Sequence, residues 1–313
     1  MRACRREAQR RKGQDSLMKI LDFGSLNLDY VYHVDHIILP GETELADDIR
    51  LFAGGKGLNQ SVALARAGAP VWHAGLIGGD GGMLRTLLED SGVHTDYLKT
   101  DPDARTGHTI IQVDRNGQNS ILLSGGTNRM ITDELADETL AHFSEGDVLV
   151  LQNEISALPH IIDRAFGIGM KIVMNPSPYD GHIASCDLSK VSLFLINEVE
   201  GMQIAGAGDP DAILRTMAER YPDADVVLTL GSAGSVFSGH GQTVRQSIFH
   251  VHAVDTTAAG DTFTGYFVSS FFAGRPVKEC MELASKASAI SVSRNGAAPS
   301  IPSLEEVREA DLH

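Results

Sequence analysis

Short apolar runs that alternate with helical patterns constrain the fold of this chain more than any other feature. The runs are almost uninterrupted, which is typical of strands buried on both faces of a parallel sheet. They follow one another from Met18 onward, at Lys19–Phe23, Val71–Ile77, Val148–Leu151, Lys171–Met174, Leu193–Ile196 and Val226–Leu230. Strand and helix repeated in this way predict a doubly wound α/β fold, with a mainly parallel sheet flanked by helices.

Helix start signals support the same alternation. Thr132 can cap a helix over Asp133–Phe143, and Asp209, followed by proline, can cap one that includes Ala212–Arg220. Ser303, with a glutamate three residues later, forms the capping-box pattern before the last helix. We therefore expect helices between the predicted strands and at the C-terminal end.

Two segments depart from this rhythm and have β-like character instead. They are Tyr30–Phe52 and Thr106–Leu123, and the second contains Asn116-Gly117, a strong hairpin signal. Each arises near the carboxyl end of an early predicted strand, where an open α/β sheet binds its ligands. We interpret the two segments as one small antiparallel sheet that forms a lid over that site. Two separate surface hairpins are the alternative.

Charge and cysteine content exclude some classes of partner. The net charge of −15 disfavours nucleic acid and anionic membranes, because both bind basic surfaces. No apolar run approaches the roughly 18 residues of a membrane span. Cys4, Cys186 and Cys280 show no paired spacing, which favours a reducing cytoplasm over a disulfide framework or a zinc site.

The first 17 residues differ from the rest of the chain in charge. Residues 1–17 carry a net charge of +4, which leaves −19 for the remainder. This opening lacks the apolar core of a secretory signal, and an Arg-rich transit peptide is one interpretation. We favour a disordered basic extension ahead of a start at Met18, followed by a single domain over residues 18–313.

The most informative motif is Asp255–Phe263, with the sequence Asp-Thr-Thr-Ala-Ala-Gly-Asp-Thr-Phe, which leads into an apolar helical run. Small residues let the backbone come close to a ligand, and the free N–H groups at a helix start can bind an anion. We interpret Ala258, Ala259 and Gly260 as an anion hole for a transferring phosphoryl group. Asp261 is then the base that accepts the proton of an attacking hydroxyl. A glycine-rich turn with Asp261 as a helix cap is the structural alternative.

A second motif, Gly54-Gly55-Lys56-Gly57-Leu58-Asn59-Gln60, also runs into a helix. Its glycines permit close approach to a substrate, and Lys56 and Asn59 can hydrogen-bond sugar hydroxyls. It is not a Walker A loop, because glycine follows Lys56 where serine or threonine is required. No Gly-x-Gly-x-x-Gly follows the first strand, which disfavours an NAD-dependent oxidoreductase. A plain glycine turn before a helix is the alternative interpretation.

Polar residues recur at the carboxyl ends of the predicted strands. An α/β sheet collects its ligand site at these ends, although each residue alone fits a surface turn better. The residues are Asn27, Asp29, Glu154, Asn197, Glu200, Thr229, Gly231 and Gly234.

Together the two motifs, in this order, resemble those of the ribokinase (PfkB) family of carbohydrate kinases, and the resemblance extends from Met18 to the end. Gly24–Asp29 resembles the first-strand signature of the family, and Ser291–Pro302 its C-terminal stretch. The resemblance implies a Rossmann-like domain with a β-lid, ATP as phosphoryl donor, Mg²⁺, and a monovalent cation such as K⁺.

The resemblance also implies roles for individual residues. The sugar would be held by Asn27, Asp29, Gly54, Gly55, Lys56, Asn59, Glu154 and Asp261. The nucleotide would be held by Asn197, Thr229, Gly231, Gly234 and Ser285. Glu200 would organise Mg²⁺, mainly through water. K⁺ would be held by Asp255, Thr257, Arg294, Gly296 and Ser300.

Three residues depart from the pattern of the family. Thr264 stands where asparagine is common, and Ser285 lies near a position that is often histidine. These two departures leave the exact nucleotide contacts open, but they do not affect the chemistry that the resemblance implies. His108 stands at a lid position that is usually apolar in ribose-specific members, which counts mildly against ribose as the substrate.

The leading hypothesis is an ATP-dependent kinase that converts D-ribose to ribose 5-phosphate. A kinase of the same family that acts on fructose, a sugar acid or a nucleoside is the alternative. A sugar-binding protein without activity is disfavoured, because binding alone does not require Asp261.

We also expect a cytoplasmic homodimer that forms through the lid, with no nucleic acid or membrane partner. A monomer whose hairpins pack on their own domain is the alternative. The apolar lid residues expected on the buried side are Ile49, Leu51, Ile111, Val113 and Ile121.

Overall fold

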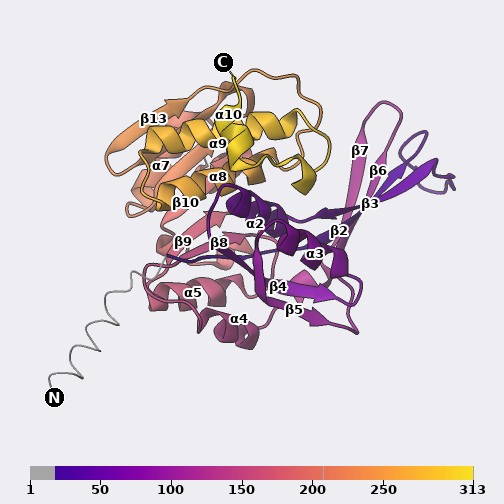
Figure 1. The fold of residues 1–313 in the computed structure, drawn as a ribbon, viewed down its shortest axis with the longest axis horizontal. Coiled ribbons are helices and arrows are strands. Elements are labelled where there is room, and N and C mark those ends of the chain that lie inside the picture. Colours follow the sequence, from indigo (N-terminus) through magenta and orange to yellow (C-terminus); the bar gives the residue numbers. More distant parts are fainter. Residues whose placement is uncertain (1–17, 207, 313) are drawn as a thin grey trace.

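The computed structural model describes residues 18–206 and 208–312. The predicted basic extension at residues 1–17 lies outside the described residues. Figure 1 shows a main body in which helices cover a large sheet, and a smaller sheet of β2, β3, β6 and β7 that stands away from that body. Within the described ranges, no helix combines the length and apolarity needed to cross a bilayer.

The large sheet has nine strands in the order β13-β12-β11-β10-β9-β8-β1-β4-β5, and the seven from β11 to β5 are parallel. All six predicted strands belong to this parallel part, which confirms the doubly wound fold. Strand β5 and the antiparallel edge pair β12 and β13 were not predicted. The strands are β1 Ile20–Phe23, β4 Val71–Gly78, β5 His94–Asp101, β8 Val148–Gln152, β9 Lys171–Asn175, β10 Leu193–Asn197, β11 Asp225–Thr229, β12 Ser235–Gly239 and β13 Gln242–Gln246.

The helices bury two apolar clusters, one on each face of the sheet. One cluster is covered by α2 Lys56–Arg66, α3 Gly82–Asp90, α8 Ala259–Phe272, α9 Val277–Val292 and α10 Leu304–Glu309. The other is covered by α4 Asp133–Leu140, α5 Leu158–Ile168, α6 Glu198–Ala205 and α7 Pro210–Arg220. Two buried apolar faces explain why the strands read as continuous apolar runs rather than as alternating ones.

The predicted helix starts are confirmed. The Thr132 side chain accepts a hydrogen bond from a backbone N–H group in the first turn of α4, and Asp209 does the same for α7. Ser303 forms a reciprocal capping box at the start of α10. Helix α4 ends at Leu140, before the predicted end at Phe143.

The two β-like segments form one sheet, which we call the lid, in the order β3-β2-β6-β7. The β2–β3 and β6–β7 pairs are antiparallel, and β2 and β6 run parallel between them. Strand β2 begins at Asn27, shortly after β1 ends at Phe23, so the lid is covalently continuous with the core of the sheet. The strands are β2 Asn27–His33, β3 Asp48–Gly54, β6 Gly107–Val113 and β7 Asn119–Ser124.

The register of the lid corrects one expectation about its apolar residues. Directly paired residues share a face, and Leu51 pairs with Tyr30, whereas Ile111 pairs with Val31 and Ile121. Tyr30 and Val31 are neighbours in β2 and point to opposite faces. The predicted set therefore divides between two faces, with Ile49 and Leu51 on one and Ile111, Val113 and Ile121 on the other.

Candidate active site

Helix α8 begins without a side-chain cap. Its N-cap residue, Ala258, has φ 61° and ψ 8°, a left-handed conformation that turns the chain sharply into the helix. No side chain accepts a hydrogen bond from the first turn of α8. The Ala259 N–H group donates to the Thr256 carbonyl oxygen at 3.3 Å. The N–H groups of Gly260 and Asp261 and the positive end of the helix dipole remain for a ligand at the start of α8. This arrangement suits an oxyanion, as expected from the Asp255–Phe263 motif.

Asp261 does not cap the helix. It is 7% exposed, and both of its carboxylate oxygens accept hydrogen bonds from α2. Asn59 Nδ2 donates to Asp261 Oδ2 at 3.0 Å, and Gln60 Nε2 donates to Oδ1 at 2.9 Å. The side-chain oxygen of Asn59, Oδ1, is buried and has no hydrogen-bond partner in the described structure. The two glycine-containing motifs thus meet at one carboxylate.

Two hollows meet at the start of α8. The smaller, about 230 Å³, is lined by polar groups that include Lys56, Asn197, Glu200 and Asp261. The larger, about 450 Å³, is more apolar and is lined by Gly231, Gly234 and Ser285, among others. Both are lined by Thr229, Thr256, Ala259, Gly260 and Phe263. An apolar hollow beside a polar one suits a nucleotide whose phosphates reach Asp261.

Asn27 and Asp29 lie at the base of the lid, on strand β2. Asn128 Nδ2 donates to Asn27 Oδ1 at 2.8 Å, and Thr109 Oγ1 donates to Asp29 Oδ1 at 2.6 Å. Burial raises the pKa of Asp29 above its ordinary value, the hydrogen bond from Thr109 opposes this, and the nearby charge of Glu154 adds to it. The side chains that face the predicted sugar position are therefore held in place before any ligand arrives.

The glycines of the second motif allow close packing at the base of the lid. Gly55 has φ 98°, and a Cβ atom there would lie 2.7 Å from the carbonyl oxygen of Ser25. A Cβ atom on Gly54 would lie 1.9 Å from Asp29 Oδ2. Both positions exclude a larger side chain, which explains why the motif is rich in glycine.

Lys56 and Glu154 form the side of the site nearest α2. The main-chain N–H group of Lys56 donates to Glu154 Oε2 at 3.2 Å, and the Ser25 hydroxyl donates to the same oxygen. Burial is the largest single influence on Lys56 and lowers the pKa of its amine. The charges of Asp261, Glu154 and Glu200 together outweigh burial and leave this pKa above its ordinary value. Lys56 is therefore a fixed positive charge beside Asp261.

Asn197 and Glu200 form a capping box at the start of α6. Glu200 accepts from the Asn197 N–H group and from Asn197 Nδ2, both at 3.0 Å, and its own N–H group donates to Asn197 Oδ1 at 2.9 Å. Each Glu200 oxygen is thus already engaged once. Glu200 lines the polar hollow, where its carboxylate can also accept from water, which fits the expected indirect contact with Mg²⁺.

Asp255 joins the loop before α8 to the loop after α9. Its carboxylate accepts from the N–H groups of Thr257 and Gly296, both at 2.9 Å. Burial, the largest single influence, raises the pKa of Asp255, but these hydrogen bonds outweigh it and leave the pKa below its ordinary value. The atoms expected to bind K⁺ here are oxygens of the Asp255 carboxylate, the Ser300 hydroxyl and the main chain at Thr257, Arg294 and Gly296, and oxygen is the ligand type that K⁺ requires. Two predicted members are engaged elsewhere: the Ser300 hydroxyl with Ser291 (2.8 Å), and the Arg294 side chain with Glu306 (2.7 Å).

Some residues of the site were not predicted. Asn175 and Ser177 line the polar hollow next to Asn197, and Gln60 holds Asp261. Asn175 ends strand β9, so the rule that ligand groups gather at strand ends could have found it. Conversely, of the residues predicted to hold the sugar, only Lys56 and Asp261 line this hollow.

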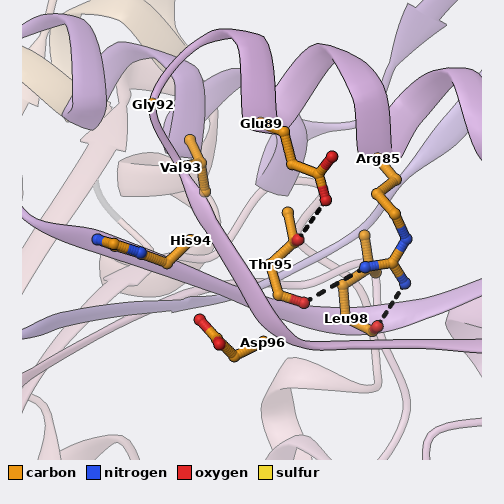
Figure 2. Close-up of a pocket in the computed structure, with 8 residues that line it drawn as sticks. All are labelled: Arg85, Glu89, Gly92, Val93, His94, Thr95, Asp96 and Leu98. Atoms are coloured by element: carbon orange, nitrogen blue, oxygen red, sulfur yellow. Dashed lines mark hydrogen bonds between the residues drawn. The ribbon is translucent and has the colours of Figure 1, made fainter.

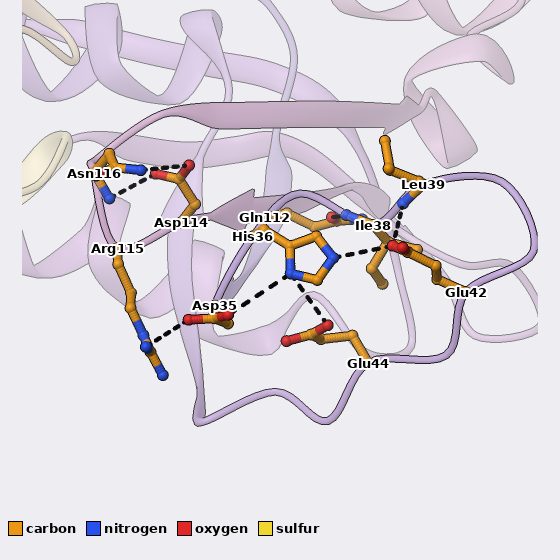
Figure 3. Close-up of polar contacts among 10 residues, drawn as sticks. All are labelled: Asp35, His36, Ile38, Leu39, Glu42, Glu44, Gln112, Asp114, Arg115 and Asn116. Carbon is orange, nitrogen blue, oxygen red and sulfur yellow. Dashed lines mark hydrogen bonds and ion pairs between the residues drawn. The ribbon is translucent and has the colours of Figure 1, made fainter.

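Two other polar regions lie away from Asp261. A hollow of about 660 Å³ at edge strand β5 contains Arg85, which donates to the carbonyl groups of Thr95 and Leu98 and so covers part of the sheet edge (Figure 2). In the loop between β2 and β3, His36 contacts three carboxylates (Figure 3). Its hydrogen bond to Glu42, followed by the charge of Glu44, raises the pKa of His36. Neither region includes a predicted site residue.

A family model described as pfkB family carbohydrate kinase matches residues 18–304. The chain belongs to this family. A ribokinase of Schizosaccharomyces pombe is 35% identical over 311 residues, which cover 93% of this chain and 97% of that protein. The structure of a ribokinase from Cryptococcus neoformans in complex with ADP superposes with a TM-score of 0.83 at 31% identity, covering 93% of this chain and 99% of that one. An Arabidopsis thaliana ribokinase complexed with ribose and ATP gives 0.82 at 28% identity, covering 93% and 98%.

Membership of the pfkB family confirms the resemblance indicated by the two motifs. It accounts for the fold as well, because the parallel sheet and the separate lid sheet together superpose on ribokinases over nearly the whole length. The assignment of roles to individual residues stays a prediction.

Proposed function

We propose that the protein transfers the γ-phosphoryl group of ATP to the primary hydroxyl of D-ribose and so forms ribose 5-phosphate and ADP. The observation that carries this proposal is the position of Asp261. It lines the polar hollow at the uncapped start of α8, next to the residues that also line the apolar hollow, with donors from α2 on both of its oxygens. The similar chains that are ribokinases, one of them complexed with ribose and ATP, support ribose as the acceptor.

The proposed reaction moves one proton and one phosphoryl group. Asp261 accepts the proton of the attacking hydroxyl, the new O–P bond forms to the γ-phosphorus, and the bond from that phosphorus to the bridging oxygen of ADP breaks. The N–H groups of Gly260 and Asp261 at the start of α8 stabilise the negative charge on the transferring oxygens. Lys56 adds a positive charge on the same side.

The remaining residues bind and orient the two substrates. Asn27, Asp29, Gly54, Gly55, Asn59 and Glu154 hold the sugar at the base of the lid, and Asn197, Thr229, Gly231, Gly234 and Ser285 hold the nucleotide. Mg²⁺ and K⁺, when bound, neutralise phosphate charge and order the anion hole. Glu200 would hold the first through water, and Asp255, Thr257, Arg294, Gly296 and Ser300 would surround the second.

Two measurements test the proposed function. A panel of sugars that includes ribose, 2-deoxyribose, fructose and nucleosides is assayed for ATP consumption, and we expect the highest kcat/KM for ribose. Asp261→Asn is expected to lower kcat by about 10²–10⁴-fold, because asparagine cannot accept the proton. Sugar binding to this variant, measured by calorimetry, should remain. A preference for another acceptor, or a near-normal kcat, would refute the corresponding part of the proposal.

We further propose that residues 18–313 form one cytoplasmic kinase domain whose lid, segments 30–52 and 106–123, also forms a homodimer contact. Exposed apolar side chains on the lid support this. Ile49 is 54% exposed, Ile121 58% and Leu122 68%, and β7 is exposed along its whole length. Strands β3 and β7 are both edge strands, and pairing with a second lid would cover these apolar residues and edges.

A further inference from the structure

A buried chain of hydrogen bonds runs from Asp261 into the sheet. Gln60, which donates to Asp261, accepts from Gln152 Nε2 at its own carbonyl oxygen, at 2.9 Å. The same Gln152 amide donates to Asp22 Oδ1 at 2.9 Å. Asp22 and Gln60 are 0% exposed and Gln152 is 1% exposed. Asp22 lies on β1 and Gln152 on the neighbouring strand β8, and neither lines the hollows at Asp261.

The chain determines which end of each amide faces which neighbour. The Asp261 carboxylate requires donors, so Gln60 presents its NH₂ group to it and turns its carbonyl away. That carbonyl requires a donor in turn, which is the NH₂ group of Gln152. Both protons of this group are used, one on Gln60 and one on Asp22. An acceptor at Asp22 therefore fixes the orientation of both amides.

The second oxygen of Asp22 is held from the opposite side. Asp22 Oδ2 lies 2.9 Å from Ser61 Oγ, which lies 2.8 Å from His73 Nδ1, and Ser61 and His73 are both 0% exposed. Burial lowers the pKa of His73 to about 3, so its ring is neutral. Burial raises the pKa of Asp22 to about 8, against the hydrogen bonds from Gln152 and Ser61 and with a contribution from the charge of Asp261.

The Ser61 hydroxyl lies between Asp22 Oδ2 and His73 Nδ1, and the buried His73 Nε2 has no hydrogen-bond partner in the described structure. If Asp22 is protonated on Oδ2, it donates to Ser61, and the Ser61 hydroxyl in turn donates to His73 Nδ1. An ionised Asp22 requires the Ser61 proton for itself, so His73 must change tautomer and donate from Nδ1. The titratable groups that face Asp22 are His73 from β4 and Asp261 from α8, whereas α2 and β8 contribute neutral amides and a hydroxyl.

We propose that Asp22 is a positioning residue for phosphoryl transfer: through its hydrogen bond it fixes Gln152 and Gln60, and these hold the Asp261 carboxylate in the orientation that accepts the substrate proton. The inference rests on the proposed role of Asp261 as the base. Ionisation of Asp22 places a buried negative charge behind Asp261 and rearranges the protons on Ser61 and His73. The alignment of the base then changes, and transfer slows.

The test compares Asp22→Val with Asp22→Asn. Valine removes the acceptor, and we expect kcat to fall by about 10- to 100-fold while both KM values stay nearly constant, because misplacement of a catalytic group affects the chemical step. Asparagine offers a carbonyl to Gln152 and an N–H group to Ser61, as the neutral acid does. It should retain kcat near pH 7 and lack the decline in kcat that the proposal predicts for the wild type as pH rises through about 8.

Each outcome decides the matter. The proposal is overturned if Asp22→Val keeps the wild-type kcat and pH profile, or if Asp22→Asn loses as much activity as the valine variant. If circular dichroism shows that the valine variant does not fold, the asparagine profile decides alone, and an unchanged alkaline decline overturns the proposal. Asp261→Asn is measured in parallel. Normal turnover in Asp261→Asn would show that Asp261 is not the base. That result would refute the proposed function, and it is distinct from a failure of the proposed role of Asp22.

Discussion

Asp22→Asn should also stabilise the folded protein, by an amount that grows with pH. Burial raises the pKa of Asp22 from 3.8 to about 8 in the folded state, although hydrogen bonds from Gln152 and Ser61 oppose the shift. Between these two pH values the unfolded chain has released a proton that the folded chain retains. The free energy of unfolding of the wild type therefore falls as pH rises from about 4 to about 8.

The magnitude follows from the width of this window. One pH unit corresponds to about 1.4 kcal/mol, so roughly four units cost the wild type on the order of 5 kcal/mol relative to a chain that does not titrate at residue 22. Asparagine is nearly isosteric with aspartate and makes the contacts of the protonated acid. The two proteins should have similar stability near pH 4, and the variant should be the more stable by several kcal/mol at pH 8.

Urea unfolding at pH 5, 6.5 and 8 measures this difference. The urea midpoint of the variant should exceed that of the wild type by a margin that widens at each higher pH, with similar slopes of the transition. Asp103→Asn, which removes an equal charge from an exposed turn, is the matched control and should show no such trend. A constant difference between Asp22→Asn and the wild type from pH 5 to pH 8 would refute the reasoning.

Three further predictions concern the base of the lid, the cation and the dimer. Gly55→Ala should lower the melting temperature and raise the sugar KM, because its Cβ atom meets the Ser25 carbonyl. Gly41→Ala, with a similar φ and no close neighbour, should not affect the sugar KM. Replacement of K⁺ by Na⁺ or Tris should lower kcat in the wild type and have less effect in Asp255→Asn. Equal wild-type rates in buffers that contain K⁺, Na⁺ or Tris would exclude the cation site. Leu122→Glu should convert a dimer to a monomer by light scattering and raise the sugar KM, and a wild type that is already monomeric would contradict the shared lid.

The fold could be predicted because the strands are buried on both faces. The predicted apolar runs in the parallel part of the sheet show neither alternating nor helical periodicity, so each is recognised as a buried strand. The caps at Thr132, Asp209 and Ser303 mark helix starts by local chemistry alone. Strand β5 was missed because His94–Asp101 lies at the sheet edge and mixes exposed and buried residues. The faces of the lid could not be predicted, because they depend on register between β2 and β6, which are far apart in sequence.

The site was predicted where its residues lie in continuous motifs. Asp261, Lys56 and Asn59 belong to two such motifs, and the structure brings these motifs into contact. Asp22 was read only as part of an apolar strand. The role of a single carboxyl group inside a buried run depends on its tertiary contacts, here with Gln152 and Ser61, which the sequence does not indicate.

The short connection between β1 and β2 has a consequence for how such a protein diversifies. Asn27 and Asp29, which we expect to select the acceptor, lie on a lid strand, whereas Asp261 and the uncapped start of α8 lie on the main body. Substitutions in the lid can therefore alter which molecule is recognised without disturbing the groups that act on phosphorus. Selection can act on these two parts of the protein separately, so that related proteins keep the same phosphoryl transfer while the acceptor changes.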